Sequence, residues 1–292
     1  MPSPTKRKIA VAIVHGMGKA TPDFADTFQR NIIRSFSQTL YPDVDHPEKE
    51  IVILPVYWAP VLDKLENKLG KRTIDKKPVH YRNLREFMIS FAGDAIAYEP
   101  APGEKQTYTA IHAVFAKTLR ELAQKAGADA PLCIIGHSLG SIIGSNYMYD
   151  LQAEARRKRI IPQKVKKFIR KTPIELGETL TLFYTLGSPI ALWSLRHRNF
   201  GMPITVPSPY LNIYHPNMEG HWSNIYDNDD VIGYPLKDIN KKYHHTVYDD
   251  IQINVGGMFT SWNPLSHMRY FENKTVAKLI GKSLAQLWKQ MI

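Results

Sequence analysis

Residues 132–140 read Leu-Cys-Ile-Ile-Gly-His-Ser-Leu-Gly, an apolar run that ends in the pentapeptide Gly-x-Ser-x-Gly. The run predicts a short buried strand, and the stretch from Gly140 onward predicts a helix. A serine between such a strand and helix sits on a sharp, strained turn, where glycines two residues to either side avoid side-chain clashes. We therefore interpret Ser138 as a nucleophile, with Gly136 and Gly140 as the glycines of the turn. The alternative is a glycine-rich helix start in which Ser138 only caps the helix.

A second glycine-rich turn, His15-Gly16-Met17-Gly18, follows the apolar run over residues 9–14. A serine nucleophile needs N–H donors that stabilise the oxyanion of its transition state. One predicted donor is the N–H of Leu139, the residue after the serine, and the other is the N–H of Met17, because glycines let this backbone approach a substrate. The alternatives are an ordinary turn between strand and helix or a phosphate-binding loop, but no Gly-Lys-Ser/Thr follows at the required spacing.

Short apolar runs alternate with helical stretches along the rest of the chain. This order predicts an α/β fold, a mostly parallel central sheet with helices on both faces. Strands are expected at residues 9–14, 51–58, 132–135, 179–186, 224–226 and 251–255. Helices are expected after Thr21, over residues 82–98 and 108–126, from Gly140 into a basic continuation after Glu154, and over 276–287.

Residues 9–18, 132–144, 181–189, 224–236 and 261–270 together resemble a serine esterase or lipase of the α/β-hydrolase family. The turn Thr185-Leu186-Gly187-Ser188-Pro189 is similar to the one that lipases carry on the strand after the nucleophile. The resemblance implies a single α/β-hydrolase domain over residues 1–292 with cap-like insertions at about 61–105 and 190–222. We expect these insertions either to cover the site and set acyl or alcohol specificity or to pack on the sheet.

The resemblance also implies a triad whose members follow the chain order serine, acid, histidine. The acid lies in the run Asn-Ile-Tyr-Asp-Asn-Asp-Asp-Val-Ile at residues 224–232, where Asp230 is the chosen acid and Asp229 its rival, because the register of the loop is ambiguous. His267 is the predicted general base, since it lies between the expected strand at 251–255 and the last helix. The alternative is a surface histidine in a loop.

These residues predict an enzyme that cleaves a small-molecule or lipid carboxylic ester through an acyl-enzyme on Ser138. The alternatives are an acyltransferase with the same triad, cleavage of an amide or thioester, or a non-catalytic binding protein that keeps the fold. No cofactor is expected, because no Gly-x-Gly-x-x-Gly is present. No metal is expected either, because His215 and His221 lack a recognised ligand spacing.

The composition is that of a globular protein, with 43% hydrophobic and 22% charged residues among 292. Much of the net charge of +11 comes from residues 156–171, the basic segment, which holds nine Lys/Arg and no acid. This segment predicts a solvated basic face or an amphipathic element that contacts an anionic membrane. Nucleic acid is not an expected partner, because the charge is local and the segment has no aromatic platform.

The single cysteine, Cys133, excludes an internal disulfide and suits a reducing compartment. No apolar run reaches the roughly 18 residues that span a membrane. We therefore expect a cytoplasmic protein, and the sequence leaves its oligomeric state open.

Overall fold

The computed structural model of the protein describes residues 8–17, 20–75, 80, 89, 92–100, 105–256 and 264–291. Within these ranges, six strands form one sheet in the order β2-β1-β3-β4-β5-β6, and each neighbouring pair runs parallel. The strands are β1 (Ile9–Val14), β2 (Ile51–Val56), β3 (Leu132–His137), β4 (Leu180–Leu186), β5 (His221–Tyr226) and β6 (Val247–Gln252). The predicted α/β fold is confirmed.

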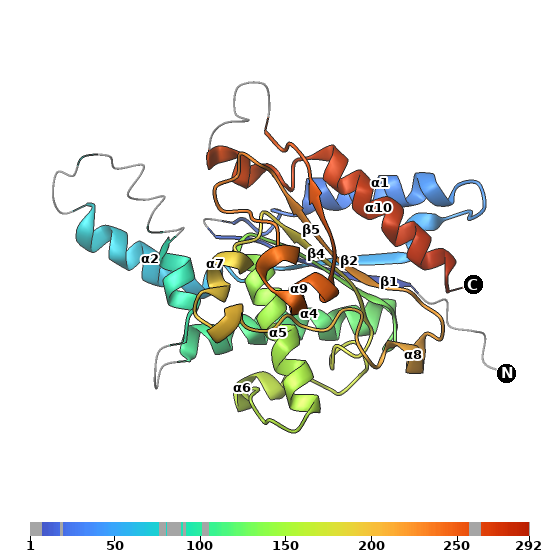
Figure 1. The fold of residues 1–292 in the computed structure, drawn as a ribbon, viewed down its shortest axis with the longest axis horizontal. Coiled ribbons are helices and arrows are strands. Elements are labelled where there is room, and N and C mark those ends of the chain that lie inside the picture. The colour runs from blue at the N-terminus through green and yellow to red at the C-terminus, as the bar shows by residue number, and fades with distance from the viewer. Residues whose placement is uncertain are drawn as a thin grey trace.

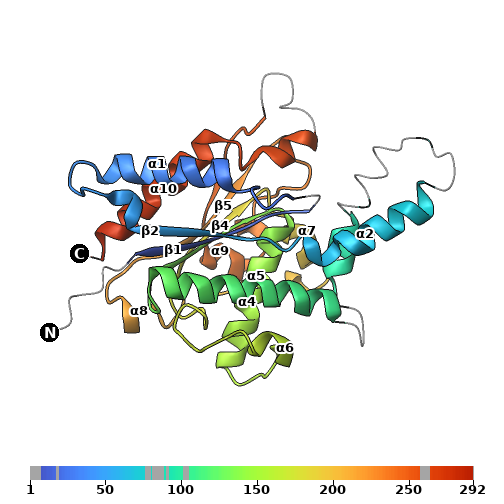
Figure 2. The same ribbon diagram turned by 180° about the vertical axis from the view of Figure 1, so that it is seen from behind.

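Helices cover both faces of this sheet (Figure 1, Figure 2). Helices α1 (Asp26–Leu40) and α10 (Lys274–Lys289) lie on one face, and α4 (Gln106–Ala126) and α5 (Leu139–Ala155) lie on the other. Other α-helices are α2 (Pro60–Thr73), α6 (Gln163–Lys166), α7 (Ile190–Ser194), α8 (Leu211–Tyr214) and α9 (Lys241–Thr246), with 3-10 turns η1 (Pro47–Lys49), η2 (Arg198–Phe200), η3 (Lys237–Ile239) and η4 (Pro264–Arg269). Of the helix expected over residues 82–98, residues 89 and 92–98 are helical, and the others lie outside the described residues. No helix in the described ranges is long and apolar enough to cross a membrane.

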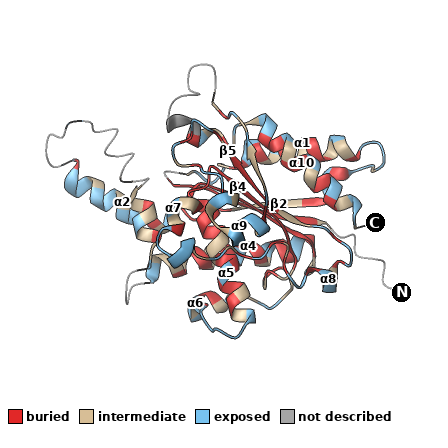
Figure 3. Cartoon of the chain, in the orientation of Figure 1, coloured by how far each residue is buried: buried red, intermediate tan, exposed pale blue. Residues whose placement is uncertain are grey.

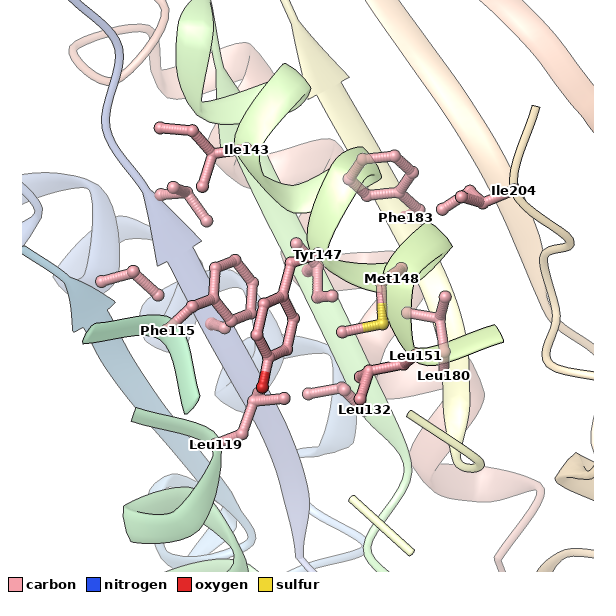
Figure 4. Close-up of a cluster of buried hydrophobic side chains, with 14 of the residues drawn as sticks. Phe115, Leu119, Leu132, Ile143, Tyr147, Met148, Leu151, Leu180, Phe183 and Ile204 are labelled. Carbon is pink, nitrogen blue, oxygen red and sulfur yellow. The ribbon is translucent and has the colours of Figure 1, made fainter. Parts of the chain in front are cut away.

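The sheet is buried between two apolar clusters (Figure 3). Strand β1 contributes to both clusters. Its side chains Ala10 and Val14 enter one cluster, and Ile9 and Ile13 enter the other. A parallel strand covered on both faces reads as a continuous apolar run rather than as an alternating one. In the cluster beneath α4 and α5, the rings of Phe115 and Tyr147 stack with centroids 4.5 Å apart (Figure 4).

Several predicted boundaries differ from the observed ones. Strand β2 ends at Val56 rather than at residue 58, and β5 begins at His221 rather than at residue 224. The first helix begins at Asp26 rather than just after Thr21. The last strand covers Val247–Gln252 instead of residues 251–255, because its partner β5 ends at Tyr226. The helix from the serine turn ends at Ala155 and does not continue into the basic segment, where Arg157 takes a positive φ of 63°. A run of like charges one turn apart disfavours a helix there.

The basic segment folds back against the body of the protein. Its apolar side chains Ile161 and Val165 are buried, and Lys117 of α4 lies 4.6 Å from the centroid of the Phe168 ring. Lys166 pairs with Glu154 near the end of α5. The inward packing leaves mainly charged side chains of this segment at the surface.

The two expected insertions differ in how they are built. In the first, α2 extends away from the sheet (Figure 1), Tyr98 is fully buried, and Phe87, Met88 and Phe91 lie outside the described residues. The second contains α7, η2 and α8, and it ends at His221, where β5 begins. Trp222 therefore belongs to the sheet and is fully buried.

Helices α1 and α10 approach so closely at Gly281 that a side chain there has no room. A Cβ at this position would lie 2.6 Å from the Ser35 Cβ and 2.7 Å from the Ile32 carbonyl oxygen. We expect Gly281→Ala to lower the free energy of unfolding by about 1–3 kcal/mol, because backbone must shift. The matched control is Gly70→Ala in α2, where a Cβ meets nothing within 4 Å. Its expected effect is a gain of about 0.5–1 kcal/mol. Urea unfolding measures both, and a Gly281→Ala protein as stable as the wild type would contradict the prediction.

Candidate active site

Ser138 lies on the turn between β3 and α5 with φ 52° and ψ −127°, a conformation that non-glycine residues rarely adopt. The glycines around it permit the turn. A Cβ at Gly136 would lie 2.6 Å from the Ser141 Cα, and a Cβ at Gly140 would lie 2.4 Å from the Val14 carbonyl oxygen. Ser138 thus lies on a strained turn between strand and helix, which is the backbone that the sequence motif predicts.

The structure brings Ser138, His267 and Asp230 into one hydrogen-bonded line. His267 Nε2 lies 2.7 Å from Ser138 Oγ, and His267 Nδ1 lies 2.9 Å and 3.0 Å from the two carboxylate oxygens of Asp230. All three residues are at least 96% buried. With a proton on Nδ1, His267 donates to the Asp230 carboxylate and its Nε2 faces the Ser138 hydroxyl.

Asp230 is held as a carboxylate by donors on several sides. The Ile232 N–H donates to one oxygen and the Tyr270 hydroxyl to the other, each at 2.9 Å. Burial alone would raise the pKa of Asp230, but the bonds from His267, Ile232 and Tyr270 outweigh it, so the pKa is lowered. The role of Tyr270 could not be predicted from the sequence, because it depends on a contact across 40 residues of chain.

The rival acid Asp229 is exposed, and its N–H donates to the Asp227 carboxylate at 3.0 Å. Asp227 is buried and accepts a second bond, from the Val255 N–H at 2.7 Å. Its own N–H donates to the Tyr270 hydroxyl at 2.9 Å. Asp227 therefore braces the acid loop, and Asp230 is the member of the loop that contacts His267.

The turn after β1 lies against the serine. A Cβ at Gly16 would lie 2.6 Å from the Ser138 Cβ, so the backbone passes directly beside the hydroxyl-bearing carbon. In the described part of the chain, the backbone amides of Met17 and Leu139 donate to no protein acceptor. Gly18 lies outside the described residues.

His15 holds this turn in place. Its Nδ1–H donates to the Gly16 carbonyl at 2.8 Å, and its Nε2 accepts from the N–H groups of Trp58 and Ala59 at 3.2 Å and 3.3 Å. The ring stacks on the Trp58 indole with centroids 4.4 Å apart. Burial lowers the pKa of His15 to about 4, against the opposing effect of the Gly16 bond. The neutral ring thus ties the turn to the start of α2.

His137 braces the other side of the site, a role that no sequence motif indicated. Its Nε2–H donates to the backbone carbonyl of His267 at 2.7 Å, and its ring packs against Tyr270 and Phe271. Burial, reinforced by the neighbouring His267, lowers the pKa of His137 to about 3. The residue next to the serine therefore fixes the backbone of the histidine that the serine contacts.

No group of three or more His, Cys, Asp or Glu side chains gathers into a metal site within the described ranges. His244 and His245 lie on α9, and His215 Nε2 bonds the Asp129 carbonyl oxygen at 2.6 Å.

Comparisons with known proteins add the following findings. No family model and no curated protein matches the chain. Among solved structures, the dienelactone hydrolase from Anabaena variabilis is 12% identical, with a TM-score of 0.41 over 99% of this chain and 89% of that one. The esterase domain of a Rhodothermus marinus protein is 12% identical, with a TM-score of 0.35 over the same shares. The chain's own topology, a parallel sheet with a strained serine after β3, defines an α/β-hydrolase fold.

Stability is expected to depend on pH through His15. The pKa of this histidine is lowered in the folded protein, so its contribution is complete above about pH 6.5 and is lost as the pH falls toward about 4. Between pH 7 and pH 5 the wild type should therefore lose roughly 2 kcal/mol more unfolding free energy than His15→Gln. Urea unfolding at both pH values measures the difference, in which the other buried histidines cancel. Equal pH dependence in the two proteins would contradict the prediction.

Proposed function

We propose that the protein is a serine hydrolase that cleaves a carboxylic ester through an acyl-enzyme on Ser138. The observation that carries the proposal is the buried line from Ser138 Oγ through His267 to the Asp230 carboxylate. A serine hydroxyl is a weak nucleophile at its ordinary pKa, and a hydrogen-bonded general base oriented by a third group activates it. The strained turn and the nearby amides of Met17 and Leu139 support the same assignment.

In the proposed reaction, Ser138 Oγ attacks the ester carbonyl carbon while His267 Nε2 takes the hydroxyl proton. The Asp230 carboxylate stabilises the imidazolium that forms, and the N–H groups of Met17 and Leu139 donate to the oxyanion. His267 then gives its proton to the departing alkoxide, which leaves as an alcohol. A water molecule attacks the acyl-enzyme by the same route in reverse and releases the acid. An alcohol in place of this water would give acyl transfer.

Labelling with a fluorophosphonate probe tests the activated serine. The wild type is expected to be labelled, and Ser138→Ala is expected to lose all labelling, because only an activated hydroxyl displaces fluoride from the probe to form the phosphonate ester. Ser145→Ala, on the same helix, is the matched control and should label like the wild type. Folded wild type that is not labelled, or labelling that survives in Ser138→Ala, would overturn the proposal.

Two variants that replace an acid by its amide, Asp230→Asn and Asp229→Asn, distinguish the roles of these two residues. Asp230→Asn is expected to lower kcat/KM for a p-nitrophenyl ester by roughly 10²–10⁴-fold, because a neutral partner neither stabilises the imidazolium nor selects the reactive tautomer. Asp229→Asn should stay within about twofold, since it changes an exposed side chain. Circular dichroism checks the folding of both. A larger loss in Asp229→Asn than in Asp230→Asn would assign the acid to position 229.

A further inference from the structure

A cavity of about 560 Å³ lies beside α5, and Ser138, His267 and Asp230 are not among its lining residues. We call it the α5 cavity. Its lining from α5 includes Ile142, Asn146, Tyr149 and Asp150, and its outer wall comes from parts of residues 193–204. Cavities of roughly 300–1,000 Å³ with mixed apolar and polar walls are typical of small-molecule sites.

The floor of the α5 cavity is a closed network of polar side chains. Asn146 donates to the Tyr98 hydroxyl at 3.2 Å, and Tyr98 donates to His112 Nε2 at 3.0 Å. His112 Nδ1 faces the Asp150 carboxylate at 3.4 Å, and the Tyr108 hydroxyl donates to the same oxygen at 2.9 Å. Each group has a partner, and His112 and Tyr98 are fully buried, so the floor is rigid.

The walls of the cavity include large apolar side chains that stay open to solvent. Tyr149, Phe200 and Met202 line it and are exposed, Met202 by 58% of its surface. Trp193 is anchored by its Nε1–H, which donates to Glu99 at 2.6 Å. Large apolar side chains held in the open next to a cavity are typical of a surface that binds an apolar ligand.

Positive charge surrounds these walls. Lys105 and Arg198 line the cavity and form no ion pair with a described residue, whereas Arg196 is paired with Glu99. A smaller hollow of about 50 Å³ shares Tyr149 and Met202 with the cavity and adds Arg156 and Lys158. Asp150 is the one acid among the described lining residues, and it lies in the floor network.

We propose that the α5 cavity binds a single-chain anionic amphiphile, with the alkyl chain on the apolar walls and the anionic head among Lys105, Arg198 and the neighbouring basic residues. The walls remove alkyl surface from water, and the cations complement the head. This binding does not depend on the chemistry proposed for Ser138.

A small ligand fits these observations better than a bilayer does. Insertion into a membrane requires apolar side chains that project outward from a basic face. In the basic segment, Ile161 and Val165 are instead buried in the fold, and Lys117 covers Phe168. The exposed apolar side chains beside this segment line the concave α5 cavity, whose shape suits a single alkyl chain better than a flat membrane.

Isothermal titration with dodecyl phosphate, below its critical micelle concentration, tests the proposal. The wild type should bind it, whereas inorganic phosphate and dodecyltrimethylammonium should not. The variant Lys105→Glu/Arg198→Glu is expected to bind about tenfold more weakly, because the charge near the head changes by four units. The matched control is Lys274→Glu/Lys282→Glu, which makes the same change at exposed positions on the opposite face of the sheet and should bind like the wild type.

Phe200→Asn tests the apolar wall separately. Phe200 has a φ of 60°, which asparagine tolerates, so the backbone is kept while the ring is removed. Weaker dodecyl phosphate binding in this variant is expected, with thermal unfolding as the check on folding. Equal affinity of the wild type and Lys105→Glu/Arg198→Glu, or equal binding of the cationic amphiphile, would overturn the proposal. So would binding to vesicles of anionic phospholipid without binding to monomeric dodecyl phosphate.

Discussion

The site depends on how closely the first turn of α5 approaches the end of β1. At Gly140 the two backbones leave no room for a Cβ, which would lie 2.4 Å and 2.5 Å from the carbonyl oxygens of Val14 and His15. This approach sets the turn after β1 beside Ser138, where a Cβ at Gly16 would lie 2.6 Å from the serine Cβ. A side chain at position 140 would push the turn and the serine apart, so a missing Cβ determines the geometry of the site.

Neutral histidines carry much of the remaining frame. His15 ties the turn after β1 to α2, and His137 ties the serine turn to the His267 backbone. Burial keeps both rings neutral. A neutral ring carries its proton on one nitrogen, and the hydrogen bonds of each ring require one particular tautomer. A cation in either place would repel the imidazolium proposed to form on His267 during the reaction. Because His15 and His137 bind a proton only weakly, His267 is left as the histidine that accepts the proton in the proposed reaction.

The local parts of this architecture could be predicted from sequence, and the long-range parts could not. The strand, turn and helix around Ser138 follow from apolar runs and glycines within about a dozen residues. The choice between Asp229 and Asp230 depends on which side chain of the loop points inward. That orientation is set by hydrogen bonds of Asp227 and Tyr270, which join residues 28 to 43 positions apart in the sequence. The end of α5 before the basic segment follows from charge repulsion that the apolar pattern alone does not reveal.

Helix α5 links the strained serine to the α5 cavity. Ile142, one turn after Ser138, already lines the cavity, and Asp150 in its floor lies three turns along, about 18 Å away at 1.5 Å per residue. The helix is buried along most of its length, so the serine and the cavity share one tightly packed element. An amphiphile bound in the α5 cavity would therefore contact the same helix that begins directly after Ser138. In the floor of the cavity, the contacts of Asn146, His112 and Asp150 hold the side chains of this helix in place.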